Sequence, residues 1–249
     1  MQTIEKKKIT NGNGTFEYAL SVKDSPAIIL INGGGGPIEG WYKVFHELSK
    51  ENTIMAYNRL GIGGSSKPES PQHGTAIANS LKQLLDDIGL SPPYLLVGHS
   101  LGGLYANLFA RMFPDQVFGV VLLEASHPQD LQINDFLPSP IRALNRFLAV
   151  FDRFSPSRQW SETQYVKQTA TQILEAGPFP DQPLVVVTGT KKPPFMSVQA
   201  YDIRMNNQSD LLQLSKKSTH ILATRSGHFP QLTEPNLVIQ AIRDCIHPK

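Results

Sequence analysis

The chain alternates between short, uninterrupted apolar runs and stretches in which apolar residues recur at helical spacing. Uninterrupted runs of this length favour strands that are buried on both faces, as in a parallel sheet. The six runs cover residues 27–32, 53–58, 94–99, 119–125, 183–189 and 220–224. Helical spacing is clear over residues 75–90 and 101–112. The alternation predicts an α/β fold, a three-layer α/β/α sandwich with a mostly parallel sheet.

The segment before the first apolar run has a different pattern. Over residues 15–22, apolar residues alternate with polar or small ones, which is typical of a strand with one buried face. Residues 11–14 read Asn-Gly-Asn-Gly, a strong signal for a tight turn between antiparallel strands. We therefore expect an antiparallel hairpin at the edge of the sheet.

Residues 127–181 interrupt the alternation. They contain six prolines and two stretches with helical spacing, over residues 141–154 and 161–176. A connection of this length is too long for a simple crossover between consecutive strands. We expect residues 127–181 to form a helical cap, inserted over one end of an α/β core made of residues 1–126 and 182–249.

Charge and cysteine content narrow the class of protein. The 249 residues carry 23 basic and 21 acidic side chains, a formal net charge of +2. So small a net charge produces no electrostatic field strong enough to indicate binding to nucleic acid or an acidic membrane. A small-molecule partner is therefore expected. Cys245 is the one cysteine, which excludes an internal disulfide and a cysteine metal cluster. No run of about 18 apolar residues occurs, so we expect a cytoplasmic protein without membrane insertion.

A serine between two glycines is the most informative motif. Gly98-His99-Ser100-Leu101-Gly102 joins an apolar run to a helical stretch, which is the context of a nucleophile elbow. Such a turn strains the serine and requires small flanking residues. The alternative is an ordinary strand-to-helix turn in which Ser100 caps the helix. The placement between strand and helix favours a catalytic serine.

Two backbone amides are candidates for an oxyanion hole. Leu101 begins the helix after the serine, where an unpaired amide and the helix dipole favour negative charge. A second donor is expected from residues 32–37, Asn-Gly-Gly-Gly-Gly-Pro, because four glycines let the backbone approach a ligand. Gly34 is the expected donor.

Together these motifs resemble the α/β-hydrolase fold superfamily, in particular its cap-bearing serine hydrolases. The resemblance rests on residues 32–36, 58–65 and 98–103 and on Ser226-Gly227-His228, and it extends over nearly the whole chain. The first loop usually opens with histidine in that family, and here the position is Asn32. The resemblance implies an esterase-like enzyme that uses no metal or organic cofactor.

The resemblance also supplies a general base. His228 follows Gly227 in the loop after the last predicted strand, where the family keeps its catalytic histidine. A histidine suits this role because its pKa lies near neutrality. His99, within the elbow, is expected to pack beside the serine.

The acid of the triad is less evident. The commonest version of the fold places an aspartate after the strand that follows the cap, and here Lys192 occupies that place. Glu124 ends the apolar run before the predicted cap. A buried carboxylate is costly unless it is paired or has a functional role. Some members of the superfamily carry the acid there, so we assign Glu124 and keep Asp202 as the alternative.

These assignments predict a Ser100–His228–Glu124 triad acting on a small-molecule acyl substrate. The expected reaction is hydrolysis of a carboxylic ester through an acyl-enzyme, with an amide or lactone as the less favoured substrate class. An acyltransferase with the same triad, or a non-catalytic ligand-binding protein of the same fold, is the alternative. Arg59, in the glycine-rich turn over residues 58–65, is expected to tie loop carbonyls together.

Overall fold

In the computed structural model, eight strands form one sheet within the described residues, which are 3–23, 25–130, 160–194 and 196–247. The strand order is β1-β2-β4-β3-β5-β6-β7-β8. The strands are β1 (Lys7–Asn11), β2 (Gly14–Ser21), β3 (Ala27–Ile31), β4 (Ile54–Asn58), β5 (Tyr94–His99), β6 (Val117–Leu123), β7 (Leu184–Gly189) and β8 (Ser218–Ala223). Each of the six predicted apolar runs corresponds to one of the strands from β3 to β8.

The sheet is parallel except at the edge formed by the N-terminal hairpin. β1 pairs with β2 and β2 with β4 in antiparallel register, whereas β4, β3, β5, β6, β7 and β8 pair in parallel. Asn11 pairs with Gly14, so Gly12 and Asn13 form the tight turn that the sequence predicts. The expected hairpin at the sheet edge and the expected α/β fold are both confirmed.

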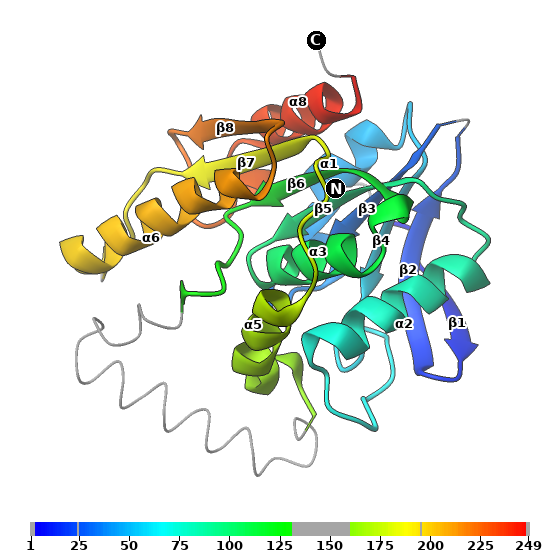
Figure 1. Ribbon diagram of the computed structural model, residues 1–249. Helices are drawn as coiled ribbons and strands as arrows, with labels where there is room; N and C mark the ends of the chain where they lie inside the picture. Colours follow the sequence, from blue (N-terminus) through cyan, green and yellow to red (C-terminus); the bar gives the residue numbers. More distant parts are fainter. Residues whose placement is uncertain (1–2, 24, 131–159, 195, 248–249) are drawn as a thin grey trace.

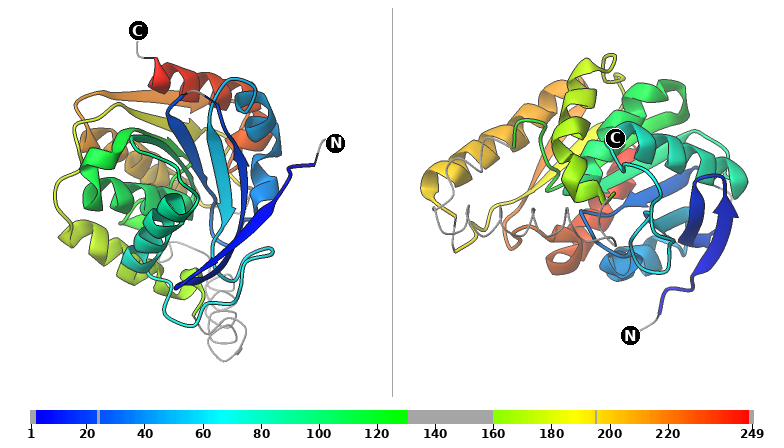
Figure 2. Two further views of the ribbon diagram at one scale, coloured as in Figure 1. Left: turned by 90° about the vertical axis from the view of Figure 1, so that its right-hand side faces the viewer. Right: turned by 90° about the horizontal axis from the view of Figure 1, so that it is seen from below.

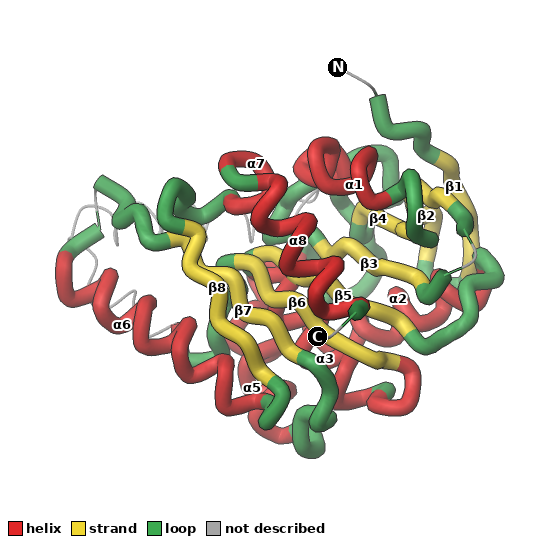
Figure 3. The backbone as a smooth tube through the Cα atoms, turned by 90° about the horizontal axis from the view of Figure 1, so that it is seen from above, coloured by secondary structure: helices red, strands yellow, loops and turns green. Residues whose placement is uncertain are grey.

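Helices cover both faces of the sheet, and Figure 2 shows the resulting layers. One face carries α1 (Tyr42–Leu48) and α8 (Pro235–Ile246), which lie in front of the strands in Figure 3. The other face carries α2 (Gly74–Asp87), α3 (Leu101–Met112) and α5 (Val166–Glu175). The remaining helices of the described residues are α6 (Val198–Asp210), α7 (Pro230–Thr233) and the short 3-10 turns η1 (Ile38–Trp41), η2 (Pro114–Gln116), η4 (Glu162–Tyr165) and η5 (Leu211–Leu214).

Alternation along the strands divides the core between these layers. Ile29 and Ile31 of β3 belong to the apolar cluster with α2 and α3, while Ile28 and Leu30 belong to the cluster with α1 and α8. Successive side chains of a strand point to opposite faces, so a continuous apolar run serves both clusters. Each of these four side chains is fully buried, which stabilises the fold by about 1.5–3 kcal/mol per residue.

The connection between β6 and β7 returns over the α2–α3 face. Its described parts are residues 124–130 and 160–183, and the second includes η4 and α5, which account for the predicted helix over 161–176. α5 packs against α2 and α3, and Ile173 joins their apolar cluster (Figure 1). The other predicted helix, over 141–154, lies outside the described residues. The division into a core and a cap at residues 127–181 stays a prediction.

The candidate site residues lie at the carboxyl edge of the sheet, where the parallel strands end. Asn32 follows β3, Ser100 follows β5 and Glu124 follows β6, each at the carboxyl end of its strand. His228 lies in the loop between β8 and α7. This edge is where ligands bind in open α/β sheets. No helix of the described residues is long and apolar enough to cross a membrane.

Candidate active site

Ser100 has a strained backbone. Its φ is +51° and its ψ is −122°, and a residue with a side chain adopts such values only where the surroundings enforce them. The Ser100 amide donates to the carbonyl of Leu123 at 3.1 Å, and the Ser100 carbonyl accepts from the amide of Ser126 at 2.9 Å. The turn is thus fixed against the neighbouring strand β6.

The flanking glycines are required by close contacts. A Cβ atom on Gly98 would lie 2.6 Å from the carbonyl oxygen of Gly102. A Cβ on Gly102 would lie 2.2 Å from the carbonyl oxygen of Ile31 and 2.4 Å from that of Asn32. The chain therefore has the tight geometry of a nucleophile elbow. Ser100 makes no side-chain capping hydrogen bond to α3, which weighs against the capping alternative.

Ser100 and His228 line one cavity of about 190 Å³. Its other walls are the glycine loop after β3 and the segment that leads into α7. Within the described residues, Ser100 Oγ has no hydrogen-bond partner, so in this structure no bond joins it to His228. Apo active sites often hold such contacts long until substrate binds.

His228 is held by its neighbours and faces Glu124. His99 Nε2 lies 2.7 Å from the carbonyl oxygen of His228, and the two rings lie 5.0 Å apart. The His228 side chain is 46% exposed. Its Nδ1 lies 3.6 Å from Glu124 Oε2, within ion-pair range but longer than a hydrogen bond. The structure therefore brings the predicted base and the predicted acid together.

Glu124 is buried, and both of its carboxylate oxygens accept hydrogen bonds. Its side chain is 1% exposed, and its backbone has a positive φ of +46°, as Ser100 does. Oε1 accepts a hydrogen bond of 2.6 Å from the amide of Gly189, and Oε2 is bonded by a guanidinium nitrogen of Arg204. Sequence reasoning missed Arg204. The signal for it is that a carboxylate closing an apolar strand needs a cationic partner somewhere in the chain.

The alternative acid has no such environment. Asp202 is exposed on α6, and its carboxylate makes no hydrogen bond or ion pair to any described residue. Lys192, at the place where the commonest version of the fold has its aspartate, donates from Nζ to the carbonyl of Met196 at 2.7 Å. Of the two candidates, Glu124 is therefore the one beside His228.

His99 is buried beside the serine, as expected. It is 4% exposed and contacts the rings of Trp41 and Phe229. Burial lowers its pKa to about 4, although the hydrogen bond to His228 acts in the opposite direction. The His99 ring is thus neutral near pH 7, and Nε2 carries the hydrogen that it donates to the carbonyl of His228.

Arg59 holds the glycine loop. Its NH1 donates to the carbonyl of Asn32 at 2.8 Å and its NH2 to that of Gly33 at 2.7 Å, so the expectation from the sequence is confirmed. Glu162 of η4, which sequence reasoning missed, forms a buried ion pair with Arg59. Burial is the largest single influence on the pKa of Arg59 and lowers it, but the charge of Glu162, its hydrogen bonds and the neighbouring tyrosines together raise the pKa above its ordinary value.

The two residues that carry the predicted oxyanion donors are neighbours in space. A Cβ atom on Gly34 would lie 3.2 Å from Cδ2 of Leu101. Neither the Gly34 amide nor the Leu101 amide has a hydrogen-bond partner among the described residues, and Gly34 lines the cavity beside Ser100. In the described part of the chain, no group of three or more His, Cys, Asp or Glu side chains could hold a metal ion.

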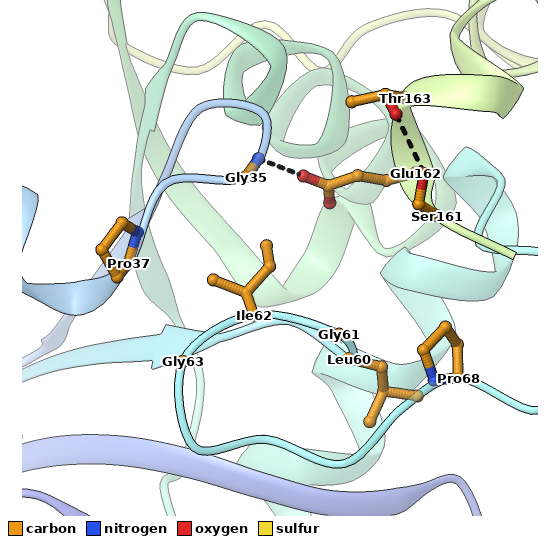
Figure 4. Close-up of a pocket in the computed structure, with 10 residues that line it drawn as sticks. All are labelled: Gly35, Pro37, Leu60, Gly61, Ile62, Gly63, Pro68, Ser161, Glu162 and Thr163. Atoms are coloured by element: carbon orange, nitrogen blue, oxygen red, sulfur yellow. Dashed lines mark hydrogen bonds between the residues drawn. The ribbon is translucent and has the colours of Figure 1, made fainter. Parts of the chain in front are cut away.

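A larger cavity of about 500 Å³ lies along the same glycine loop. Gly35 and Pro37 form one side, Leu60 and Ile62 another, and Ser161 to Thr163 the third (Figure 4). Pro37 also lines the cavity beside Ser100, so the two cavities share a wall. Figure 4 shows the carboxylate of Glu162 turned toward the amide of Gly35.

A strained serine elbow at the carboxyl edge of a mostly parallel sheet is typical of α/β hydrolases. The family model described as alpha/beta hydrolase fold matches residues 26–173, more than half of the chain, and the chain belongs to that family.

Named relatives share moderate identity. The chain is 28% identical over 221 residues to the uncharacterized protein YqjL of Bacillus subtilis (strain 168), covering 87% of this chain and 82% of YqjL. It is 27% identical over 157 residues to rat (Rattus norvegicus) 1-acylglycerol-3-phosphate O-acyltransferase ABHD5, covering 59% of this chain and 45% of ABHD5. The chain thus spans about half the length of ABHD5.

Solved structures share the fold. Wild-type Cfl2 from Burkholderia cenocepacia superposes with a TM-score of 0.73 at 17% identity, covering 97% of this chain and 95% of Cfl2. The carboxylesterase CesB from Bacillus subtilis gives a TM-score of 0.67 at 17% identity, covering 98% and 92%. At this level of identity, these likenesses show a shared fold.

Proposed function

We propose that the protein is a serine hydrolase that cleaves a carboxylic ester through an acyl-enzyme, with Ser100 as nucleophile, His228 as base and Glu124 as acid. One arrangement carries the proposal: Ser100, on its strained elbow, lines the same cavity as His228, whose Nδ1 lies 3.6 Å from Glu124. A hydroxyl is a weak nucleophile until a base takes its proton, and the shared cavity supports His228 as that base.

The reaction follows from these positions. Because Nδ1 faces Glu124, Nε2 of His228 is the nitrogen left to take the proton from Ser100 Oγ as the oxygen attacks the ester carbonyl. The amides of Gly34 and Leu101 bind the developing oxyanion. Collapse of the tetrahedral intermediate expels the alcohol, which takes the proton from His228. Water then attacks the acyl-enzyme, with His228 again as base, and the carboxylic acid leaves.

The substrate in this proposal is a small acyl ester, and an amide or lactone is the less favoured possibility. Acyl transfer by the same three residues is the second candidate, because ABHD5, a relative over 59% of this chain, is named as an acyltransferase. In that case an alcohol or amine replaces water in the second step. Product analysis with and without an added acceptor separates the two.

The test is labelling with a fluorophosphonate probe and turnover of a short p-nitrophenyl ester. We expect both in the parent protein and neither in Ser100→Ala, with unfolding curves that coincide. Ser209→Ala, on the exposed surface of α6, is the matched control and should behave like the parent. Full activity in Ser100→Ala would contradict the mechanism. A parent that binds ligand but neither labels nor turns over would favour the non-catalytic alternative.

A further inference from the structure

A buried ion pair joins η4 to the glycine loop. Arg59 is 3% exposed and Glu162 is 5% exposed. Both Nε and NH2 of Arg59 donate to the Glu162 carboxylate. The guanidinium also lies over the ring of Tyr105, 5.0 Å from its centroid. A buried pair of this kind persists only where its remaining donors and acceptors are also satisfied.

Those remaining groups come from the glycine loop. NH1 and NH2 of Arg59 bond the carbonyls of Asn32 and Gly33, and Oε1 of Glu162 accepts from the amide of Gly35 at 2.9 Å. Arg59 and Glu162 thus bind the loop backbone on both sides of Gly34. The Gly34 amide lies between the bonded Gly33 carbonyl and the bonded Gly35 amide, and it has no hydrogen-bond partner among the described residues.

The direction of that free amide follows from the planar peptide bond. The peptide between Gly33 and Gly34 is trans, so its carbonyl and its N–H point in opposite directions. The Gly33 carbonyl is bonded to Arg59, and the Gly34 N–H must therefore point away from Arg59. Gly33 and Gly34 also line the cavity that holds Ser100. The hydrogen bond from Arg59 to the Gly33 carbonyl therefore also orients the Gly34 amide.

We propose that Glu162 and Arg59 are positioning residues that together orient the Gly34 amide toward the substrate oxyanion. Glu162 fixes the guanidinium, the guanidinium fixes the Gly33 carbonyl, and the peptide plane fixes the amide. Glu162 belongs to the connection between β6 and β7, so the orientation of one oxyanion donor depends on the packing of this segment against the glycine loop. Figure 4 shows that packing where the Glu162 carboxylate meets the amide of Gly35. The inference rests on the proposed ester hydrolysis by Ser100.

An alkyl trifluoromethyl ketone provides the readout. Ser100 Oγ adds to the ketone carbon, its proton passes to His228, and the carbonyl becomes an oxyanion in the proposed hole. Glu162→Gln can still accept from Gly35 but no longer neutralises Arg59. We expect kcat to fall about 10–100-fold, less than the 10²–10³-fold cost of deleting a donor, with KM nearly unchanged. Affinity for the ketone should fall by the same factor as kcat/KM.

Two further variants distinguish an effect on the orientation of the Gly34 amide from an effect on folding. Arg59→Lys keeps the charge but loses the fork that holds two carbonyls, and we expect the same selective loss. Glu162→Asp serves if Glu162→Gln does not fold, because its shorter side chain cannot reach both Arg59 and Gly35. Asp181→Asn is the control: it removes a carboxylate that binds the hydroxyl of Ser215 and the amide of Lys216, and should leave kcat unchanged.

Three outcomes would overturn the proposal. The first is parental kcat and ketone affinity in Glu162→Gln and Arg59→Lys. The second is a loss of activity that only tracks the fraction unfolded at the assay temperature, since that marks a purely structural pair. The third is an absence of Ser100-dependent hydrolysis in the parent, which defeats the proposed function as well. In the first two cases the Ser100 mechanism stands alone.

Discussion

Oε2 of Glu124 lies 3.6 Å from Nδ1 of His228, and the same oxygen is bonded by Arg204. One carboxylate oxygen is therefore shared between the candidate base and a cation from α6. The other oxygen is fixed by the Gly189 amide at the end of β7. Glu124 is thus held at the carboxyl end of β6, one strand away from the place where the commonest version of the fold keeps its acid.

The first prediction concerns the acid. Glu124→Gln should lower kcat steeply, by about 10⁴-fold, because an amide neither fixes the tautomer of His228 nor stabilises its charged form. Asp202→Asn is the matched control and should leave kcat unchanged, since the Asp202 side chain is exposed and its carboxylate has no hydrogen bond or ion pair with a described residue. Steady-state kinetics with a p-nitrophenyl ester measure both. The reverse result would move the acid to Asp202.

The second prediction concerns Arg204. Arg204→Met leaves the Glu124 carboxylate buried without its cation, and we expect the free energy of unfolding to fall by about 3 kcal/mol. Urea unfolding of the parent, both single variants and Glu124→Gln/Arg204→Met forms a double-mutant cycle. The double variant should lose less than the sum of the single losses. Strict additivity would show that the two side chains are not coupled in solution.

The apolar runs predicted most of the fold because they are local signals. β3 to β8 coincide with the runs in the sequence, and their ends differ by only a few residues. The elbow is equally local: the steric limits on Gly98 and Gly102 arise within a few residues of Ser100 and where the chain passes the end of β3. A pattern of residues along the chain carries this kind of information.

The polar partners of the site could not be predicted in the same way. Glu162 lies 103 residues from Arg59, and Arg204 lies 80 residues from Glu124. Nothing in the local sequence says which of many charged side chains will meet across such a distance. The sequence indicates only that a partner is required. A buried carboxylate requires a cation, and a buried guanidinium requires an anion.

The third prediction concerns pH. Burial lowers the pKa of His99 to about 4 in the folded protein, whereas an unfolded histidine has a pKa of about 6.5. Between these values the unfolded state binds a proton that the folded state does not. Acidification therefore favours unfolding, and the contribution of His99 is a loss of about 3 kcal/mol on going from pH 7 to pH 4.

Unfolding curves at several pH values check this effect. His99→Gln keeps a donor for the carbonyl of His228 but cannot titrate, so its stability should depend less steeply on pH than that of the parent. His247→Gln, which changes an exposed histidine, is the control and should keep the parental pH dependence. Equal slopes for His99→Gln and the parent would mean that His99 is already protonated in the folded state near pH 6.

The fourth prediction concerns the contact between the elbow helix and the glycine loop. A methyl group on Gly102 would lie 2.2 Å from the carbonyl oxygen of Ile31 and 2.4 Å from that of Asn32. Both obstacles are backbone atoms, so a side chain cannot rotate away to relieve the clash. Gly102→Ala should therefore lower the free energy of unfolding by about 1–3 kcal/mol, as overpacking does in a dense core.

Gly177→Ala is the matched control, because no atom lies within 4 Å of its added methyl group. Its stability should stay within about 1 kcal/mol of the parent. Because any relief of the Gly102 clash moves Asn32 and the residues after it, Gly102→Ala should also lose activity in the fraction that remains folded. If Gly102→Ala is as stable and as active as the parent, then α3 and the glycine loop do not approach as closely in solution as this structure places them.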